Sequence, residues 1–94
     1  MKRYFVYIMT NKPKGTLYIG VTNDIERRSS EHIIKTGSQY TKKYNLKRVV
    51  YLEETSDINL AIAREKQLKN WHRQWKINLN ESANPNWDAL LASD

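Results

Sequence analysis

The chain has 94 residues, no cysteine and a formal net charge of +6 at pH 7. A chain of this length supports one hydrophobic core, so we expect a single domain over residues 1–94. The lack of cysteine excludes disulfides and thiolate metal sites, and a bound metal is therefore expected to be a hard ion such as Mg²⁺ or Mn²⁺.

The positive charge favours nucleic acid as the partner, because a basic protein attracts polyanions. No segment approaches the roughly 18–20 consecutive apolar residues that a membrane-spanning helix needs. We therefore expect no membrane partner and a cytoplasmic location.

The first part of the chain predicts a β-hairpin. Residues 3–9 (RYFVYIM) are aromatic, branched and apolar with almost no interruption, which is typical of a central strand buried on both faces. Turn-forming residues at 11–15 (NKPKG) predict the loop, and residues 16–21 (TLYIGV) predict the returning strand. Gly20 within this strand indicates that another group, such as a ligand, approaches the backbone closely.

The rest of the chain alternates between helical patterns, one loop and one strand. The expected segments are a helix at 24–35 with a capping box of Asn23 and Glu26, a loop rich in cations and tyrosines at 38–47, a strand at 48–53, a helix from Ser56 or Asp57 to about Trp71, a helix carrying Trp75 and Leu79 that ends before Asn84, and an apolar cover formed by Trp87, Leu90 and Leu91.

Glu65 is unusual because it falls near the centre of an apolar stripe formed by Ile58, Ala61, Ile62 and Leu68. Burial of an ionised carboxylate is costly unless a cation stands opposite it, so we expect either an arginine or a metal ion there. From the pattern alone, an ion pair with Arg28 or Arg64 is favoured over a metal site.

Arg28 and His32 lie four residues apart on the helix face that Ile25 marks as inward. A guanidinium suits a phosphate because its donors are paired and its charge is permanent. A histidine can position or deprotonate a water near neutral pH. Each residue alone is more often structural, and only their combination with Glu65 favours a site.

Tyrosines and basic residues form the remaining candidates. Tyr7 and Tyr18 are expected on neighbouring strands, where two hydroxyl groups can orient a water if a cation assists them. Arg27, Tyr40, Lys42 and Lys43 mix aromatic rings with positive charge, which favours contacts to phosphates and bases over a merely solvated loop.

These residues together resemble the GIY-YIG nuclease superfamily, in particular its small single-domain bacterial members of the UPF0213 type. Tyr18-Ile19-Gly20 matches the second half of the signature, and Phe5-Val6-Tyr7 stands at the first half, with phenylalanine in place of the usual glycine. The resemblance implies an α+β fold with a three-stranded antiparallel β-sheet flanked by helices, and an active site on the sheet face that holds both motif tyrosines.

The resemblance also implies roles for individual residues. Glu65 corresponds to the metal-binding glutamate and Arg28 to the arginine that grips the scissile phosphate. Tyr18 is the expected general base, assisted by Tyr7 and His32, while Asn78 and Asn84 compete for a further position.

The implied activity is endonucleolytic hydrolysis of DNA with Mg²⁺ or Mn²⁺, with repair or recombination as the implied setting. Two alternatives stay open. One is a non-catalytic nucleic-acid-binding module that retains the site, and the other, weaker one is a protein adaptor that uses Trp71, Trp75 and Trp87. Tryptophans at helical spacing are more often core residues.

Overall fold

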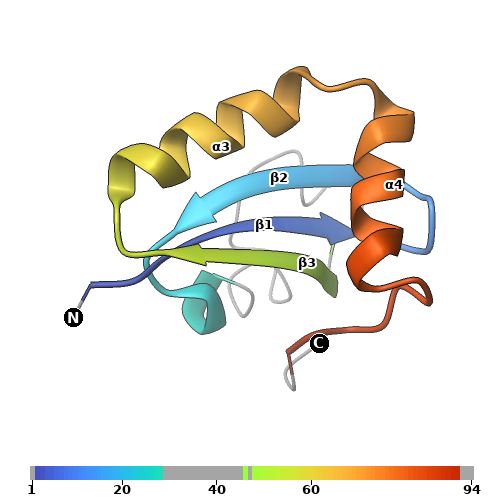
Figure 1. Cartoon of the computed structure of the whole chain (residues 1–94). Helices are drawn as coiled ribbons and strands as arrows, with labels where there is room; N and C mark the ends of the chain where they lie inside the picture. The colour runs from blue at the N-terminus through green and yellow to red at the C-terminus, as the bar shows by residue number, and fades with distance from the viewer. Residues whose placement is uncertain (1, 29–45, 47, 92–94) are drawn as a thin grey trace.

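The computed structural model describes residues 2–28, 46 and 48–91. Three antiparallel strands form one sheet in the order β2-β1-β3 (Figure 1). The strands are β1 (Tyr4–Thr10), β2 (Leu17–Thr22) and β3 (Arg48–Thr55), and the helices that follow are α3 (Ile58–Asn70) and α4 (Arg73–Ala83). The predicted α+β class with a three-stranded antiparallel sheet is confirmed.

The central position of the first strand is also confirmed. All residues of β1 after Tyr4 are buried, which agrees with a strand that has neighbours on both edges and cover on both faces. Tyr7 lies opposite Gly20 on β2 and opposite Leu52 on β3. The register with β3 shifts between Ile8 and Met9, which marks a β-bulge.

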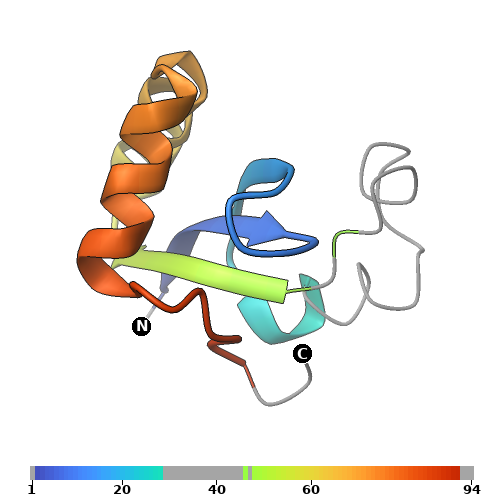
Figure 2. The ribbon, with the colours of Figure 1, turned by 90° about the vertical axis from the view of Figure 1, so that its right-hand side faces the viewer.

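Side chains that alternate along the strands build two apolar clusters, one on each face of the sheet. Val6, Ile8 and Ile19 belong to the cluster that contains Leu68 of α3 and Ile77 of α4. Figure 2 shows these two helices together on one side of the sheet. The cluster on the opposite face consists of Phe5, Tyr7, Met9, Ile25, Leu46 and Val49.

The helical turn at residues 25–28 begins one residue later than the capping-box pattern predicts. The Asp24 side chain accepts a hydrogen bond from the Arg27 backbone N–H at 3.2 Å, so Asp24 is the N-cap and the predicted box of Asn23 and Glu26 is wrong. Thr22 Oγ1 accepts a hydrogen bond from the Asp24 N–H at 3.1 Å. The predicted helix end lies outside the described residues, and so does the predicted loop at 38–47 apart from Leu46.

Helix α3 starts as predicted, because Asp57 caps it by accepting a bond from the Asn59 N–H at 2.8 Å. Its expected apolar stripe is only partly right. Ala61 and Leu68 are buried, whereas 43% of Ile58 and 37% of Ile62 are exposed. The small Ala61 side chain lets the helix approach the sheet along a narrow line, so its larger apolar residues lie at the margins.

The C-terminal segment folds back over the core, as predicted for Trp87 and Leu91, whereas 45% of Leu90 is exposed. Asn84 ends α4, and its buried amide donates to the carbonyls of Val50 and Asp88 at 2.9 Å. Trp87 is buried, but Trp75 is not a core residue, because 53% of it is exposed. Among the described residues, no helix is long and apolar enough to cross a bilayer.

Candidate active site

Tyr7 occupies space that the absent side chain of Gly20 leaves open. A Cβ atom at position 20 would lie 2.4 Å from the Tyr7 hydroxyl oxygen and 2.6 Å from its Cζ atom. The two residues are direct partners on β1 and β2, and Tyr7 is only 1% exposed. The close approach predicted at Gly20 is therefore made by the phenol ring of Tyr7.

Arg28 connects the helical turn to the two tyrosines. Its Nε donates a hydrogen bond to the Tyr7 hydroxyl at 3.3 Å, and the rings of Tyr7 and Tyr18 are 6.3 Å apart between centroids. The hydrogen bond to Tyr7 raises the pKa of Arg28, burial lowers it, and a hydrogen bond to Tyr18 raises it further. The guanidinium is therefore permanently charged and held between two hydroxyl groups.

The Tyr7 hydroxyl itself is not readily ionised. Burial raises the pKa of Tyr7 to about 12, although the hydrogen bond from Arg28 acts in the opposite direction. At neutral pH the phenol thus keeps its proton. Tyr18 is only partly buried, so it is the more accessible of the two motif tyrosines.

Glu65 reaches the same group of residues from helix α3. After burial, the charges of Tyr18 and Glu65 also raise the pKa of Tyr7, so the carboxylate lies close enough to act on the hydroxyl. The Glu65 side chain is 18% exposed. Tyr7, Tyr18 and Arg28 are therefore in contact, and Glu65 acts on Tyr7 through its charge.

The expected arginine partner of Glu65 is wrong. Its carboxylate pairs with Lys69 on the same helix, with 3.5 Å between Oε2 and Nζ. Arg64 instead donates three hydrogen bonds of 2.9–3.2 Å to Glu53 on β3. The spacing of four residues between Glu65 and Lys69 is a helical ion-pair signal, and it was available in the sequence.

Any metal at this site would take few ligands from the described residues, which contain no group of three or more His, Asp or Glu side chains placed to hold one. Glu65 offers one partly exposed carboxylate. Mg²⁺ commonly binds through one or two carboxylates, waters and substrate phosphates. The donor set fits a largely hydrated hard ion, with Lys69 as a competing cation.

Of the other candidate residues, three lie in the described part of the chain and four lie outside it. Arg27 is exposed beside Arg28, and Asn84 is occupied by backbone groups of the fold. Asn78 is exposed on α4 and accepts a hydrogen bond from Gln74 at 2.9 Å. His32, Tyr40, Lys42 and Lys43 lie outside the described residues.

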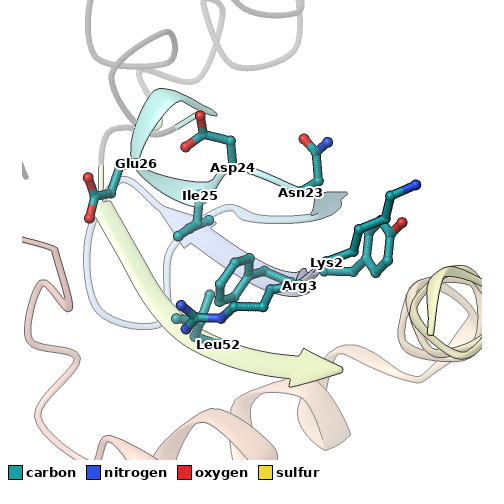
Figure 3. A pocket seen from close by; sticks show the side chains of 9 residues that line it. Lys2, Arg3, Asn23, Asp24, Ile25, Glu26 and Leu52 are labelled. Carbon is teal, nitrogen blue, oxygen red and sulfur yellow. The ribbon is translucent and has the colours of Figure 1, made fainter. Parts of the chain in front are cut away.

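A cavity of about 570 Å³ lies near the start of β1 (Figure 3). Its lining combines the cations Lys2 and Arg3 with the anions Asp24 and Glu26, around apolar side chains that include Ile25. None of Tyr7, Tyr18, Arg28 and Glu65 lines it. The cavity is therefore separate from the candidate active site.

Comparisons with known proteins agree with the motifs. Residues 3–78 match the GIY-YIG catalytic domain. A UPF0213 protein of Staphylococcus saprophyticus is 35% identical over 79 residues, which cover 84% of this chain and 95% of that protein. A UPF0213 protein of Syntrophus aciditrophicus is 38% identical over 80 residues, covering 84% and 91% of the two chains.

A solved structure supports the fold. The solution NMR structure of the UPF0213 protein BH0048 from Bacillus halodurans has a TM-score of 0.57 to this chain at 24% sequence identity. The match covers 98% of this chain and 99% of that one.

Proposed function

Because the chain belongs to the GIY-YIG catalytic domain family, within its UPF0213 group, we propose that it is a divalent-metal-dependent endonuclease that hydrolyses DNA. In this proposal residues 1–94 form one domain that acts in the cytoplasm, in repair or recombination. The observation that carries the proposal is the contact among Tyr7, Tyr18 and Arg28, with the charge of Glu65 acting on Tyr7.

Arg28 is the proposed binding residue for the scissile phosphate. Its hydrogen bond to the buried Tyr7 hydroxyl restrains the plane of the guanidinium. A restrained guanidinium can stabilise charge that develops on phosphate oxygens without first being ordered. Tyr7 is thus proposed as a positioning residue, since its pKa of about 12 makes it a poor base at neutral pH.

Tyr18 is the proposed general base, with His32 assisting. Tyr18 is partly exposed, and its hydrogen bond with Arg28 places a positive charge beside its hydroxyl. Arg27, Tyr40, Lys42 and Lys43 are proposed to contact the nucleic acid on either side of the reacting phosphate.

Glu65 is the proposed protein ligand of Mg²⁺ or Mn²⁺. When bound, such an ion supplies positive charge that stabilises the phosphate and the leaving oxygen. The 18% exposure of the Glu65 side chain leaves it accessible to a hydrated ion, and the effect of its charge on the pKa of Tyr7 supports a position within electrostatic reach of the tyrosines.

The test is cleavage of labelled single-stranded, duplex and branched DNA in the presence of Mg²⁺ or Mn²⁺. Glu65→Gln preserves the size of the side chain and should abolish cleavage. Glu54→Gln is the matched control, because Glu54 is exposed, pairs with Arg3 and should be dispensable. Absence of cleavage on every substrate, or full activity of Glu65→Gln, would refute the proposal.

The second candidate is a nucleic-acid-binding module without turnover. The ion pair with Lys69 favours it, because the ammonium satisfies the charge of Glu65 without a metal. This module would bind DNA with an affinity that falls steeply with salt, at a log–log slope of about 0.9 per phosphate contact on duplex DNA. Cleavage that requires both metal and Glu65 would exclude it.

A further inference from the structure

Trp75 is an exposed aromatic residue that the proposed active site does not use. It is the third residue of α4, and 53% of it is exposed. Its ring meets Trp71 at 6.0 Å and His72 at 5.1 Å between centroids, in both cases nearly perpendicular. Two edge contacts restrain the indole without covering it, which lowers the entropy lost when a ligand stacks on it.

The surroundings of Trp75 are strongly basic. Residues 64–76 contain five lysines and arginines and one carboxylate, Glu65. Arg73 donates hydrogen bonds to the backbone carbonyls of Lys14 and Gly15, and Lys76 donates to the Lys69 carbonyl at 3.4 Å. These acceptors are neutral, so the bonds orient the two cations without cancelling their charge.

Lys76 is partly buried and lies near the positive charge of Arg73. Burial lowers its pKa, and the positive charge of Arg73 lowers it further. A ligand that brings negative charge between these two side chains would relieve the repulsion. The patch therefore favours an anionic partner over an apolar or cationic one.

The patch is continuous with the proposed active site along α3. The Glu65 carboxylate pairs with the Lys69 ammonium, and the backbone carbonyl of Lys69 accepts the hydrogen bond from Lys76. From Glu65 to the end of α3 at Asn70 the helix rises about 8 Å, at 1.5 Å per residue. Two or three stacked nucleotides span that distance at about 3.4 Å each.

We propose that this α3–α4 corner, formed by Trp71, His72, Arg73, Trp75 and Lys76, binds single-stranded nucleic acid. An unpaired base stacks on Trp75, and Arg73 and Lys76 contact the phosphates. A duplex keeps its base faces stacked on each other and cannot use the indole in this way. The inference rests on the proposed endonuclease function and specifies its substrate as a strand that is unpaired beside the cleavage point.

The experiment measures binding separately from cleavage. The parent protein is Glu65→Gln, and three variants add Trp75→Ala, Trp75→Phe or Leu60→Ala to it. Each protein is titrated, without metal, into fluorescein-labelled oligothymidylate and into a labelled duplex of equal length. Leu60 is the matched control because it is an apolar residue on the surface of α3, 61% exposed.

We expect Trp75→Ala to weaken oligothymidylate binding about 5- to 150-fold, the range for loss of one base-stacking contact. Trp75→Phe should restore most of the affinity, and Leu60→Ala should leave it unchanged. Equal binding by Trp75→Ala, equal losses for single strand and duplex, or no binding of oligothymidylate by the parent protein would each overturn the inference. If the corner instead binds protein or a second copy of the chain, the parent protein will not bind oligothymidylate.

The two proposals fail in different ways. If the wild-type chain cleaves DNA and Trp75→Ala cleaves it equally well, the corner is refuted and the endonuclease stands. If oligothymidylate binding depends on Trp75 but no substrate is cleaved, the corner stands as part of a binding module.

Discussion

Replacement of Gly20 by alanine should destabilise the protein through Tyr7. The added Cβ would lie 2.4 Å from the hydroxyl oxygen and 2.6 Å from Cζ, distances too short for any non-bonded contact. Tyr7 is 1% exposed, so its ring cannot move aside into solvent. Overpacking of this kind costs about 1–3 kcal/mol.

The sign of the effect makes the test specific. Where the backbone tolerates it, alanine in place of glycine stabilises a protein by about 0.4–1 kcal/mol, because the unfolded chain loses freedom. No glycine in the described residues has a positive φ, so the backbone conformation does not oppose Gly20→Ala, and the three atoms nearest to the added Cβ all belong to Tyr7. We therefore expect a loss of about 2 kcal/mol, which is about 8–16 °C in Tm for a domain of this size.

A double-mutant cycle in urea denaturation isolates the contact. Tyr7→Leu shortens the side chain opposite Gly20, and in that background Gly20→Ala should be neutral or stabilising. Gly20→Ala should also reduce cleavage, because the displaced hydroxyl releases Arg28. The same loss of stability in both backgrounds would show that Tyr7 is not the cause and would refute the reasoning.

Three more predictions concern charged and titrating side chains. Burial opposes ionisation of Glu53, but hydrogen bonds from Arg64 and Tyr51 outweigh it and lower its pKa. The ion pair of Glu53 and Arg64 therefore stabilises the fold at pH values above the ordinary glutamate pKa, and this contribution is lost as the pH falls. Arg64→Ala should accordingly reduce the decrease in the urea midpoint between about pH 7 and about pH 3. Burial raises the pKa of Tyr7 to about 12, and stability should fall as pH rises from about 10 towards that value. Tyr7→Phe should flatten this alkaline loss in circular dichroism, and an unaltered profile would contradict the assignment. Lys69→Gln removes the cation 3.5 Å from Glu65 and should lower the Mg²⁺ concentration for half-maximal cleavage, whereas an increase would show that Lys69 supports metal binding.

The strands and the candidate site were largely predictable because their signals are local. A dense run of aromatic and branched residues at 3–9 requires cover on both faces, and β1 has it. Tyr7 and Gly20 become partners once the hairpin fixes the register. Arg28 lies on the helical turn directly after β2. Its contact with Tyr7 can therefore be predicted once the direction of that turn is known.

The orientation of α3 was harder to predict because several apolar residues compete for one face. Ile58 and Ile62 suggest a wide stripe, but the contact line runs through Ala61 and Leu68. That rotation brings Arg64 against Glu53, a pairing between residues of α3 and β3 that no spacing in the sequence indicates. A helix with a weak apolar face takes its rotation from the surface it meets.

The hydrogen bonds of the C-terminal segment have a consequence for association between copies of the chain. Strand β3 lies at one margin of the sheet, and a margin with unpaired backbone groups invites strand addition from another molecule. Here the Leu90 N–H donates to the Val49 carbonyl at 2.9 Å, and the Asn84 amide takes the Val50 carbonyl. The chain thus shields part of its own open margin, and a truncation before Asn84 would uncover acceptors that a second copy could fill.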